Sequence, residues 1–111
     1  MEKLEGLWTV SFQSNFQTFG TGVAVFKHDR ILGGDSFYYY DGKVKFQGDM
    51  VEARVQIVRF NRTGVAIFGN LDSFNLKAAG TIAASDMELH GNMVEQPNMK
   101  ITIKCKKITG F

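Results

Sequence analysis

The sequence predicts an all-β protein folded as an antiparallel, up-and-down, eight-stranded barrel. Apolar and polar residues alternate with a period of two along most of the chain, which is typical of strands with one buried and one solvated face. The links between these stretches are too short for the crossovers that parallel strands need. About eight strands with one apolar face each can close into a barrel, which removes the exposed edges of an open sheet.

Length and composition indicate one domain. A chain of 111 residues is in the usual range for a single domain, so we expect residues 1–111 to form one barrel. The formal charge of +2 is too small to indicate direct nucleic-acid binding. The N-terminus has no signal-peptide pattern, and no window reaches the ~18 apolar residues of a membrane span. We therefore expect a cytoplasmic protein that does not contact a membrane.

The first two strands are expected over residues 4–13 and 20–27. One apolar face of the first strand consists of Leu4, Gly6, Trp8, Val10 and Phe12. The second strand alternates small residues, which let another backbone come close, and these are Gly20, Gly22 and Ala24. Val23 and Val25 between them are also apolar, so this strand is covered on either one face or both.

Two turns and a hairpin are expected next. Residues 28–30 are typical of a hairpin turn, and Gly33-Gly34-Asp35 predicts a second tight turn because glycine adopts positive φ angles easily. Residues 37–40 then form a strand. The dipeptide Asp41-Gly42 is typical of a type I′ hairpin that leads into a further strand over residues 43–47.

The second half continues the alternation after one interruption. Residues 51–57 predict an amphipathic strand, but the alternation lapses between residues 61 and 70. This apolar connection is the one place where a short helix or a cover over the core fits. Strands resume at 74–82, 87–93 and 99–106. The last strand carries a basic cluster that we expect on its solvated face, made of Lys100, Lys104, Lys106 and Lys107.

No pattern in the sequence amounts to a catalytic, metal or cofactor site. Gly20-Thr21-Gly22 is half of a dinucleotide-binding fingerprint, but Val25 stands at the third glycine position. His28 and His90 lie in different elements without further ligands spaced around them. Asp35 fits either a general base or, more simply, an acceptor for the N–H groups of its own turn. We therefore expect no cofactor and no enzymatic activity.

The apolar strand faces predict the interior of the barrel. With about eight strands, an interior is either filled by side chains or holds one small ligand, and both alternatives stay open here. A tyrosine, either Tyr38 or Tyr40, could supply a polar contact for such a ligand. The expected cavity residues are Trp8, Val10, Phe12, Phe26, Tyr38, Tyr40, Val55, Ile57, Leu76, Leu89, Ile101 and Ile103.

The tripeptide Gly6-Leu7-Trp8 resembles the Gly-x-Trp signature of the lipocalin and calycin barrels. This resemblance implies a lipocalin-like barrel in which the tryptophan plugs the closed end. It also implies that a basic residue of the last strand packs over the tryptophan, and Lys104, Lys106 and Lys107 are the candidates.

A longer series of motifs runs in order from residue 6 to residue 70. It consists of Gly6–Asn15, Gly20–Gly22, Ile31–Asp35, Tyr40–Gly42, Arg59–Asn61 and Val65–Gly69. The motif positions include Gly20, Gly22, Gly33, Gly34, Asp35, Arg59, Asn61, Phe68 and Gly69. This series resembles the GrlR family, negative regulators of type III secretion genes in enteric pathogens. The resemblance implies a homodimeric, lipocalin-like barrel with an apolar cavity, which binds a transcriptional activator protein rather than DNA.

One departure from the family limits what can be carried over. The best-known member uses an acidic Glu-Asp-Glu-Asp loop for its activator, whereas residues 46–50 here read Phe-Gln-Gly-Asp-Met. No partner-binding residue is therefore assigned. We expect a GrlR-like regulatory protein that acts through protein–protein binding, with or without modulation by a ligand. The alternative is a lipocalin-like protein that binds a small apolar ligand.

Overall fold

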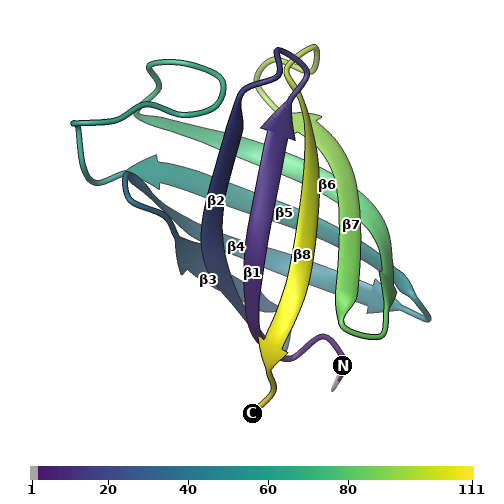
Figure 1. Ribbon diagram of the computed structural model, residues 1–111. Coiled ribbons are helices and arrows are strands. Elements are labelled where there is room, and N and C mark those ends of the chain that lie inside the picture. The colour runs from purple at the N-terminus through teal and green to yellow at the C-terminus, as the bar shows by residue number, and fades with distance from the viewer. Residues whose placement is uncertain (1–2) are drawn as a thin grey trace.

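The computed structural model, which describes residues 3–111, is a closed barrel of antiparallel strands (Figure 1). Each strand pairs with the next along the chain, and β8 pairs with β1 to complete the barrel. The strands are β1 (Gly6–Ser14), β2 (Phe19–Lys27), β3 (Arg30–Gly34), β4 (Tyr38–Gln47), β5 (Met50–Arg59), β6 (Ser73–Ala83), β7 (Asp86–Met93) and β8 (Lys100–Thr109). The predicted fold class, an eight-stranded up-and-down barrel, is thus confirmed.

The alternation of residues along the strands determines which side chains fill the barrel. In β1, Gly6, Trp8 and Val10 are buried while Thr9 and Ser11 are exposed. The same alternation runs through β6 and β7, where Phe74, Leu76, Met87 and Leu89 are buried. Lys100, Lys104 and Lys106 of β8 lie on the exposed face, as expected, and Lys107 is half-buried.

The predicted hairpin at Asp41-Gly42 is wrong, because both residues lie in the middle of the single long strand β4. Gly42 pairs with Ile31 of β3 on one side and with Val55 of β5 on the other. A Cβ atom at Gly42 would lie 2.4 Å from the carbonyl oxygen of Arg54. The glycine therefore serves a close approach of two backbones, and pairing along both edges of β4 overrides the local turn preference.

The predicted turn at Gly33-Gly34-Asp35 is displaced. Gly33 and Gly34 belong to β3, and the chain turns afterwards, over residues 35–37. A Cβ atom at Gly33 would lie 2.2 Å from the carbonyl oxygen of Val23 in β2. Neither glycine has a positive φ angle, so both serve close strand packing rather than a turn.

The connection between β5 and β6, residues 60–72, is a loop that covers one end of the barrel, and we call it the lid loop. A tight turn forms within it, because the N–H of Ala66 donates to the Gly69 carbonyl (2.9 Å) and the N–H of Gly69 donates to the Ala66 carbonyl (3.0 Å). Gly69 has a φ angle of 116°, which favours glycine. Of the two alternatives for this segment, the cover is present, and residues 3–111 contain no helix.

The core consists of two groups of buried residues. One surrounds Trp8 and Leu4 at one end of the barrel, and the other surrounds Tyr38 and Phe74 beside the lid loop. On the outer face of β2, Val25 is half-buried and Val23 is 49% exposed, so residues 3–111 cover that face only in part. A search of the described residues finds no helix with the length and hydropathy to span a membrane.

Candidate functional site

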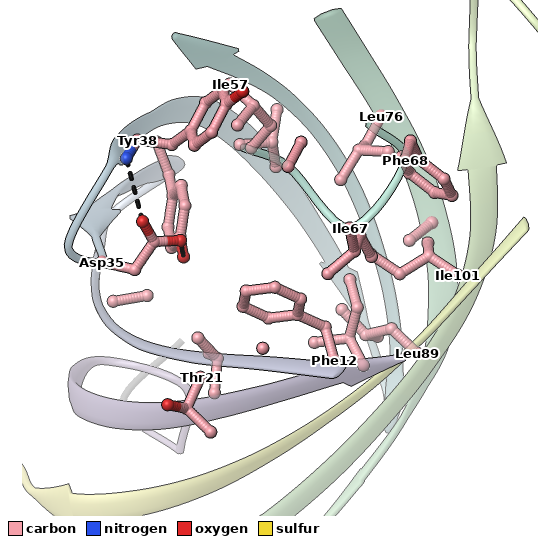
Figure 2. Close-up of a pocket in the computed structure, with 18 of the residues that line it drawn as sticks. Phe12, Thr21, Asp35, Tyr38, Ile57, Ile67, Phe68, Leu76, Leu89 and Ile101 are labelled. Carbon is pink, nitrogen blue, oxygen red and sulfur yellow. Dashed lines mark hydrogen bonds between the residues drawn. The ribbon is translucent and has the colours of Figure 1, made fainter. Parts of the chain in front are cut away.

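The barrel encloses a cavity of about 330 Å³ between its two core groups (Figure 2). Its walls are mostly apolar and come from β1 to β8 and from the lid loop. Ligand pockets in proteins measure roughly 300–1,000 Å³, and a dry apolar cavity of about 150 Å³ suffices for benzene. The space is therefore large enough for one small organic molecule.

Eleven of the twelve residues expected to form the interior line this cavity. They are Val10, Phe12, Phe26, Tyr38, Tyr40, Val55, Ile57, Leu76, Leu89, Ile101 and Ile103. Further strand residues that the prediction did not include also line it, among them Ala24, Ile31, Ala53, Phe74, Ala78 and Cys105. Phe74 and Ala78 flank Leu76 at a spacing of two, so a stricter use of the alternation would have found them.

Trp8 was expected in the cavity, but it is not among the residues that line it. Its side chain is fully buried, and its indole Nε1 donates to the carbonyl oxygen of Leu4 at 2.8 Å. Its ring meets the ring of Phe26 edge-on, with centroids 6.0 Å apart. Trp8 thus belongs to the core beyond the cavity, together with Leu4.

Among the three candidate basic residues, Lys107 is the one opposite Trp8 in the β1–β8 ladder. It is half-buried, and its Nζ donates to the carbonyl oxygen of Lys3 at 3.2 Å. Lys104 and Lys106 face solvent opposite Ser11 and Thr9. The register shifts at this point, because Leu7 pairs with Thr109 and Trp8 with Lys107, which leaves Ile108 of β8 as an extra residue between them.

A polar pair, Asp35 and Tyr40, lines one side of the cavity. Asp35 Oδ1 accepts the N–H groups of Phe37 (2.8 Å) and Tyr38 (2.9 Å), and the second of these bonds is drawn in Figure 2. Asp35 Oδ2 accepts the hydroxyl of Tyr40 at 2.6 Å. Of the two alternatives for Asp35, the acceptor for its own turn is the one that the structure shows.

The hydroxyl of Tyr40 stays protonated at ordinary pH. Burial raises the pKa of Tyr40 above its usual value, and the hydrogen bond to Asp35 raises it further. Gly22 leaves the space for this pair, because a Cβ atom there would lie 2.6 Å from the Tyr40 hydroxyl oxygen. At Gly20 a Cβ atom would lie 2.3 Å from the ring of Phe12, so both motif glycines serve the shape of the cavity wall.

Arg59 holds the lid loop in place. Its side chain is only 4% exposed, and it donates to the Gly64 carbonyl (3.2 Å), Asn70 Oδ1 (2.8 Å) and Asp72 Oδ1 (2.6 Å). The hydrogen bond to Asp72 raises the pKa of Arg59. The pKa of Asp72 is lowered, first by the hydrogen bond from Arg59 and then by that from Arg62. Three segments of the lid loop are thus tied to one side chain.

Asn61 ties the beginning of the lid loop to the β3–β4 turn. Its Nδ2 donates to the carbonyl oxygen of Ser36 at 3.2 Å, and its Oδ1 accepts the N–H and the hydroxyl of Thr63. Phe37 in the same turn accepts the N–H groups of Phe60 and Asn61 with its carbonyl oxygen. The motif residues Asp35, Arg59 and Asn61 therefore all act where the lid loop meets the barrel.

The apolar turn of the lid loop forms part of the cavity wall. Figure 2 shows Ile67 and Phe68 beside Leu76 and Ile101 of the strands, and these residues belong to one core group. The ring of Phe68 also meets that of Phe74 edge-on, with centroids 5.8 Å apart. The apolar character of residues 65–68 predicted a cover over the core as one of two alternatives, and the resemblance marked Phe68, but the alternation could not place this turn in the cavity wall, because it lies between strands.

The cavity reaches the surface beside the lid loop. Phe19 at the start of β2 and Val65 in the lid loop both line it, yet they are 71% and 57% exposed. The cavity is therefore open to solvent at these two side chains.

Cys105 lines the cavity as a free, buried thiol. Burial raises the pKa of this thiol to about 12. The thiolate is the nucleophilic form, so Cys105 acts as a small apolar wall residue rather than as a reactive group.

The described residues show no grouping for metal chemistry. Within residues 3–111, no three side chains of the types His, Cys, Asp and Glu lie close enough together to hold a metal ion. His28 and His90 are both exposed, and His90 Nε2 lies 2.8 Å from Glu88 Oε2 on the outer face. The two histidines therefore occupy the surface positions that their isolation in the sequence suggests.

The fold and the cavity define a closed antiparallel barrel with an apolar interior. In comparisons with known proteins, this chain is similar to a solved structure of a redesigned β-barrel, with a TM-score of 0.70 and 15% sequence identity. The alignment covers 96% of this chain and 92% of that chain. No protein-family model and no curated protein matches the sequence. The similarity supports the barrel fold alone, and the resemblance to the GrlR family stays a prediction from the sequence.

Proposed function

We propose that this protein binds one small, mostly apolar molecule inside the barrel. The observation that carries the proposal is the cavity of about 330 Å³, whose mostly apolar walls contain the hydrogen-bonded pair Asp35 and Tyr40. Sites for small molecules typically combine such apolar walls with a few placed polar groups that orient the ligand. The exposed side chains of Phe19 and Val65 mark the route of access.

The charge of the cavity wall favours a ligand with a hydrogen-bond donor. Among the described residues that line the cavity, none is Lys, Arg or His, and Asp35 is the only carboxylate. The Tyr40 hydroxyl donates its proton to Asp35 Oδ2, so the Tyr40 hydroxyl oxygen and Asp35 Oδ2 can each act only as acceptors toward a ligand. An amine or an alcohol complements these acceptors, whereas a carboxylate would meet a like charge in a poorly solvated space.

Three probes with the same alkyl chain test this proposal by titration calorimetry: octylamine, octanol and octanoate. We expect octylamine to bind most tightly, octanol next, and octanoate at least about tenfold more weakly than octanol, since that ratio corresponds to ~1.4 kcal/mol. Failure of all three probes to bind would refute the proposed cavity function. Tightest binding by octanoate would refute the assignment of the polar pair.

The variant Asp35→Asn keeps an oxygen for the turn and removes the charge. We expect it to lose the preference for octylamine over octanol while it still binds octanol. The matched control is Asp41→Asn, which removes the same charge from the exposed face of β4, where Asp41 pairs with Arg30 at 2.7 Å. This control should keep the wild-type order of affinities.

A second candidate function is GrlR-like regulation through contact with a protein, in a homodimer or with a transcriptional activator. The sequence resemblance motivates it, and one structural observation favours it. Val23, Leu32 and Tyr39, on the adjacent strands β2, β3 and β4, are all about half exposed. Gly34 pairs with both Val23 and Tyr39, so these apolar side chains share one outer face. Such adjoining apolar side chains are common in protein contacts.

This candidate is tested in the native host. Deletion of the gene should change transcription of a defined set of genes, and affinity purification of the wild type should recover the corresponding regulator. The variant Tyr39→Lys should neither restore the wild-type transcription in the deletion strain nor recover the regulator. The variant Lys104→Ala, on the opposite side of the barrel, should do both. Unchanged transcription after deletion, together with recovery of no regulator, would refute the regulatory function.

A further inference from the structure

The outer face of the barrel carries four cations in one continuous row across neighbouring strands. Arg30 of β3 pairs with Lys43 of β4, Lys43 pairs with Arg54 of β5, and Arg54 pairs with Lys77 of β6. All four side chains are exposed. We call these residues the cation row. Side chains directly opposite each other in an antiparallel pair lie close together, and like charges in such positions destabilise a sheet.

The cation row lies in a hollow of the outer surface, which we call the outer groove. This groove has a volume of about 970 Å³ and is lined by β3 to β7 and by Val94. It contains five Lys and Arg side chains and two carboxylates, so its net charge is three positive charges. The whole chain carries only +2, and the remainder of the molecule is therefore slightly negative.

Few of the cations in this row are neutralised by the protein itself. Arg30 forms an ion pair with Asp41 at 2.7 Å. Within residues 3–111, no carboxylate lies at ion-pair distance from Lys43, Arg54 or Lys77. The cations of β8 differ, because Lys104 and Lys106 stand opposite Glu88 and Asp86 of β7. In the outer groove, the cations therefore outnumber the carboxylates, and three of the four residues of the cation row have no ion pair with a described residue.

We propose that the outer groove binds an acidic segment of a polypeptide. Neighbouring strands lie about 4.8 Å apart, so the four cations of the row span about 14–15 Å. An extended peptide advances about 3.4 Å per residue, so about five residues rich in Asp and Glu cover this distance. Carboxylates on such a segment accept paired hydrogen bonds from Arg54 and single ones from Lys43 and Lys77.

The uncharged residues of the outer groove favour a peptide over a nucleic acid. Gln56, Asn75 and Asn92 line it, and their amide groups can both donate to and accept from a peptide backbone. Its described lining holds no Phe, Tyr or Trp, the side chains that form most base-stacking surfaces, and its one aromatic ring is the imidazole of His90, whose Nε2 lies 2.8 Å from Glu88 Oε2. The groove lies outside the barrel, and this inference does not depend on a ligand in the cavity.

Fluorescence anisotropy with a labelled Glu-Ser repeat peptide tests the inference on the full chain. We expect binding that weakens with increasing salt, because exposed charges are screened. The double variant Arg54→Ala/Lys77→Ala should weaken binding at least about tenfold. Its matched control, Lys104→Ala/Lys106→Ala, loses the same charge from the other side of the barrel and should bind within about twofold of the wild type.

Three outcomes would overturn the inference: no binding of the peptide, equal weakening by both double variants, or tighter binding of a labelled DNA oligonucleotide of equal charge. The urea midpoint adds a readout that does not need the peptide. If the cation row is repulsive, Arg54→Ala/Lys77→Ala should unfold at a higher urea concentration than the Lys104→Ala/Lys106→Ala control at low salt. A lower midpoint for the groove variant would contradict the repulsion on which the site is argued.

Discussion

Trp8 is surrounded on every side at the end of the barrel beyond the cavity. Its side chain is fully buried, its Nε1 donates to the Leu4 carbonyl at 2.8 Å, and its ring packs on Phe26. Replacement by alanine would leave a large void and an unpaired carbonyl. We expect Trp8→Ala to lower the free energy of unfolding by about 3–5 kcal/mol, measured by urea denaturation.

The control for this prediction is Phe16→Ala, which removes an exposed aromatic side chain from the β1–β2 loop. That variant should change the free energy of unfolding by less than about 0.5 kcal/mol. A Trp8→Ala protein with an unchanged urea midpoint would show that the burial of Trp8 contributes nothing to stability.

Individual residues differ in how far the sequence predicts their positions. The acceptor role of Asp35 follows from its place after two glycines, because a short carboxylate reaches the N–H groups two and three residues on. Its hydrogen bond to Tyr40 could not be predicted, because it depends on the space that Gly22 of β2 leaves beside both side chains. The alternation predicted Trp8 in the cavity, because it defines a face but no depth, and the structure places Trp8 in the core beyond the cavity.

At the scale of elements, the lid loop depends on the three-way contact of Arg59 with Gly64, Asn70 and Asp72. A lysine has one charged nitrogen and cannot reproduce this set. We expect Arg59→Lys to speed hydrogen exchange at the Gly69 amide at least about tenfold, since loss of a charged hydrogen bond costs about 1.5–3 kcal/mol. The amides of β1 and β8 should exchange as before.

The control for the lid loop is Arg62→Lys, the same substitution at an exposed residue that also contacts Asp72. It should leave exchange at Gly69 nearly unchanged. Equal acceleration by both variants would mean that loss of any guanidinium contact to Asp72, and not the three contacts of Arg59, controls the lid loop.

The ion pairs of Asp72 also make the stability depend on pH. The pKa of Asp72 is lower in the folded protein than in the unfolded chain, where it is about 3.9. The ionised carboxylate therefore adds to the free energy of unfolding above about pH 3.9, and this addition is lost as the pH falls through the lowered pKa. Urea denaturation should therefore show wild type more stable than Asp72→Asn at neutral pH, with the two converging in acid. A difference in stability that persists in acid would show that the Asp72 side chain does not stabilise the protein through its negative charge.

The elements of this fold were largely predictable, with two instructive exceptions. Alternation located most strands, because a strand with one buried face repeats every two residues. It could not tell that β4 continues through Asp41-Gly42, since that depends on Ile31 and Val55 in neighbouring strands. The contacts of the tight turn in the lid loop could not be predicted either, because its core group joins residues of several strands that lie far apart in the sequence.

For the whole molecule, closure of the barrel follows from the number of strands and their short links, and the structure confirms it. The volume of the interior does not follow from the same pattern. Three small inward residues, Ala24, Ala53 and Ala78, line it and leave space that larger side chains would fill. Whether such a space stays open depends on how side chains pack in three dimensions, so a list of apolar positions could not decide it.

The central claim, that the cavity binds a small apolar molecule, is tested most directly by filling it. Ala78→Phe places a ring in the interior, and Ala79→Phe makes the same change at the next residue, on the exposed face of β6. Octanol binding to the two folded variants and the wild type is then measured by titration calorimetry. We predict that Ala78→Phe abolishes binding while Ala79→Phe binds like the wild type. Equal binding by all three proteins would contradict the claim, because octanol would then bind outside the barrel.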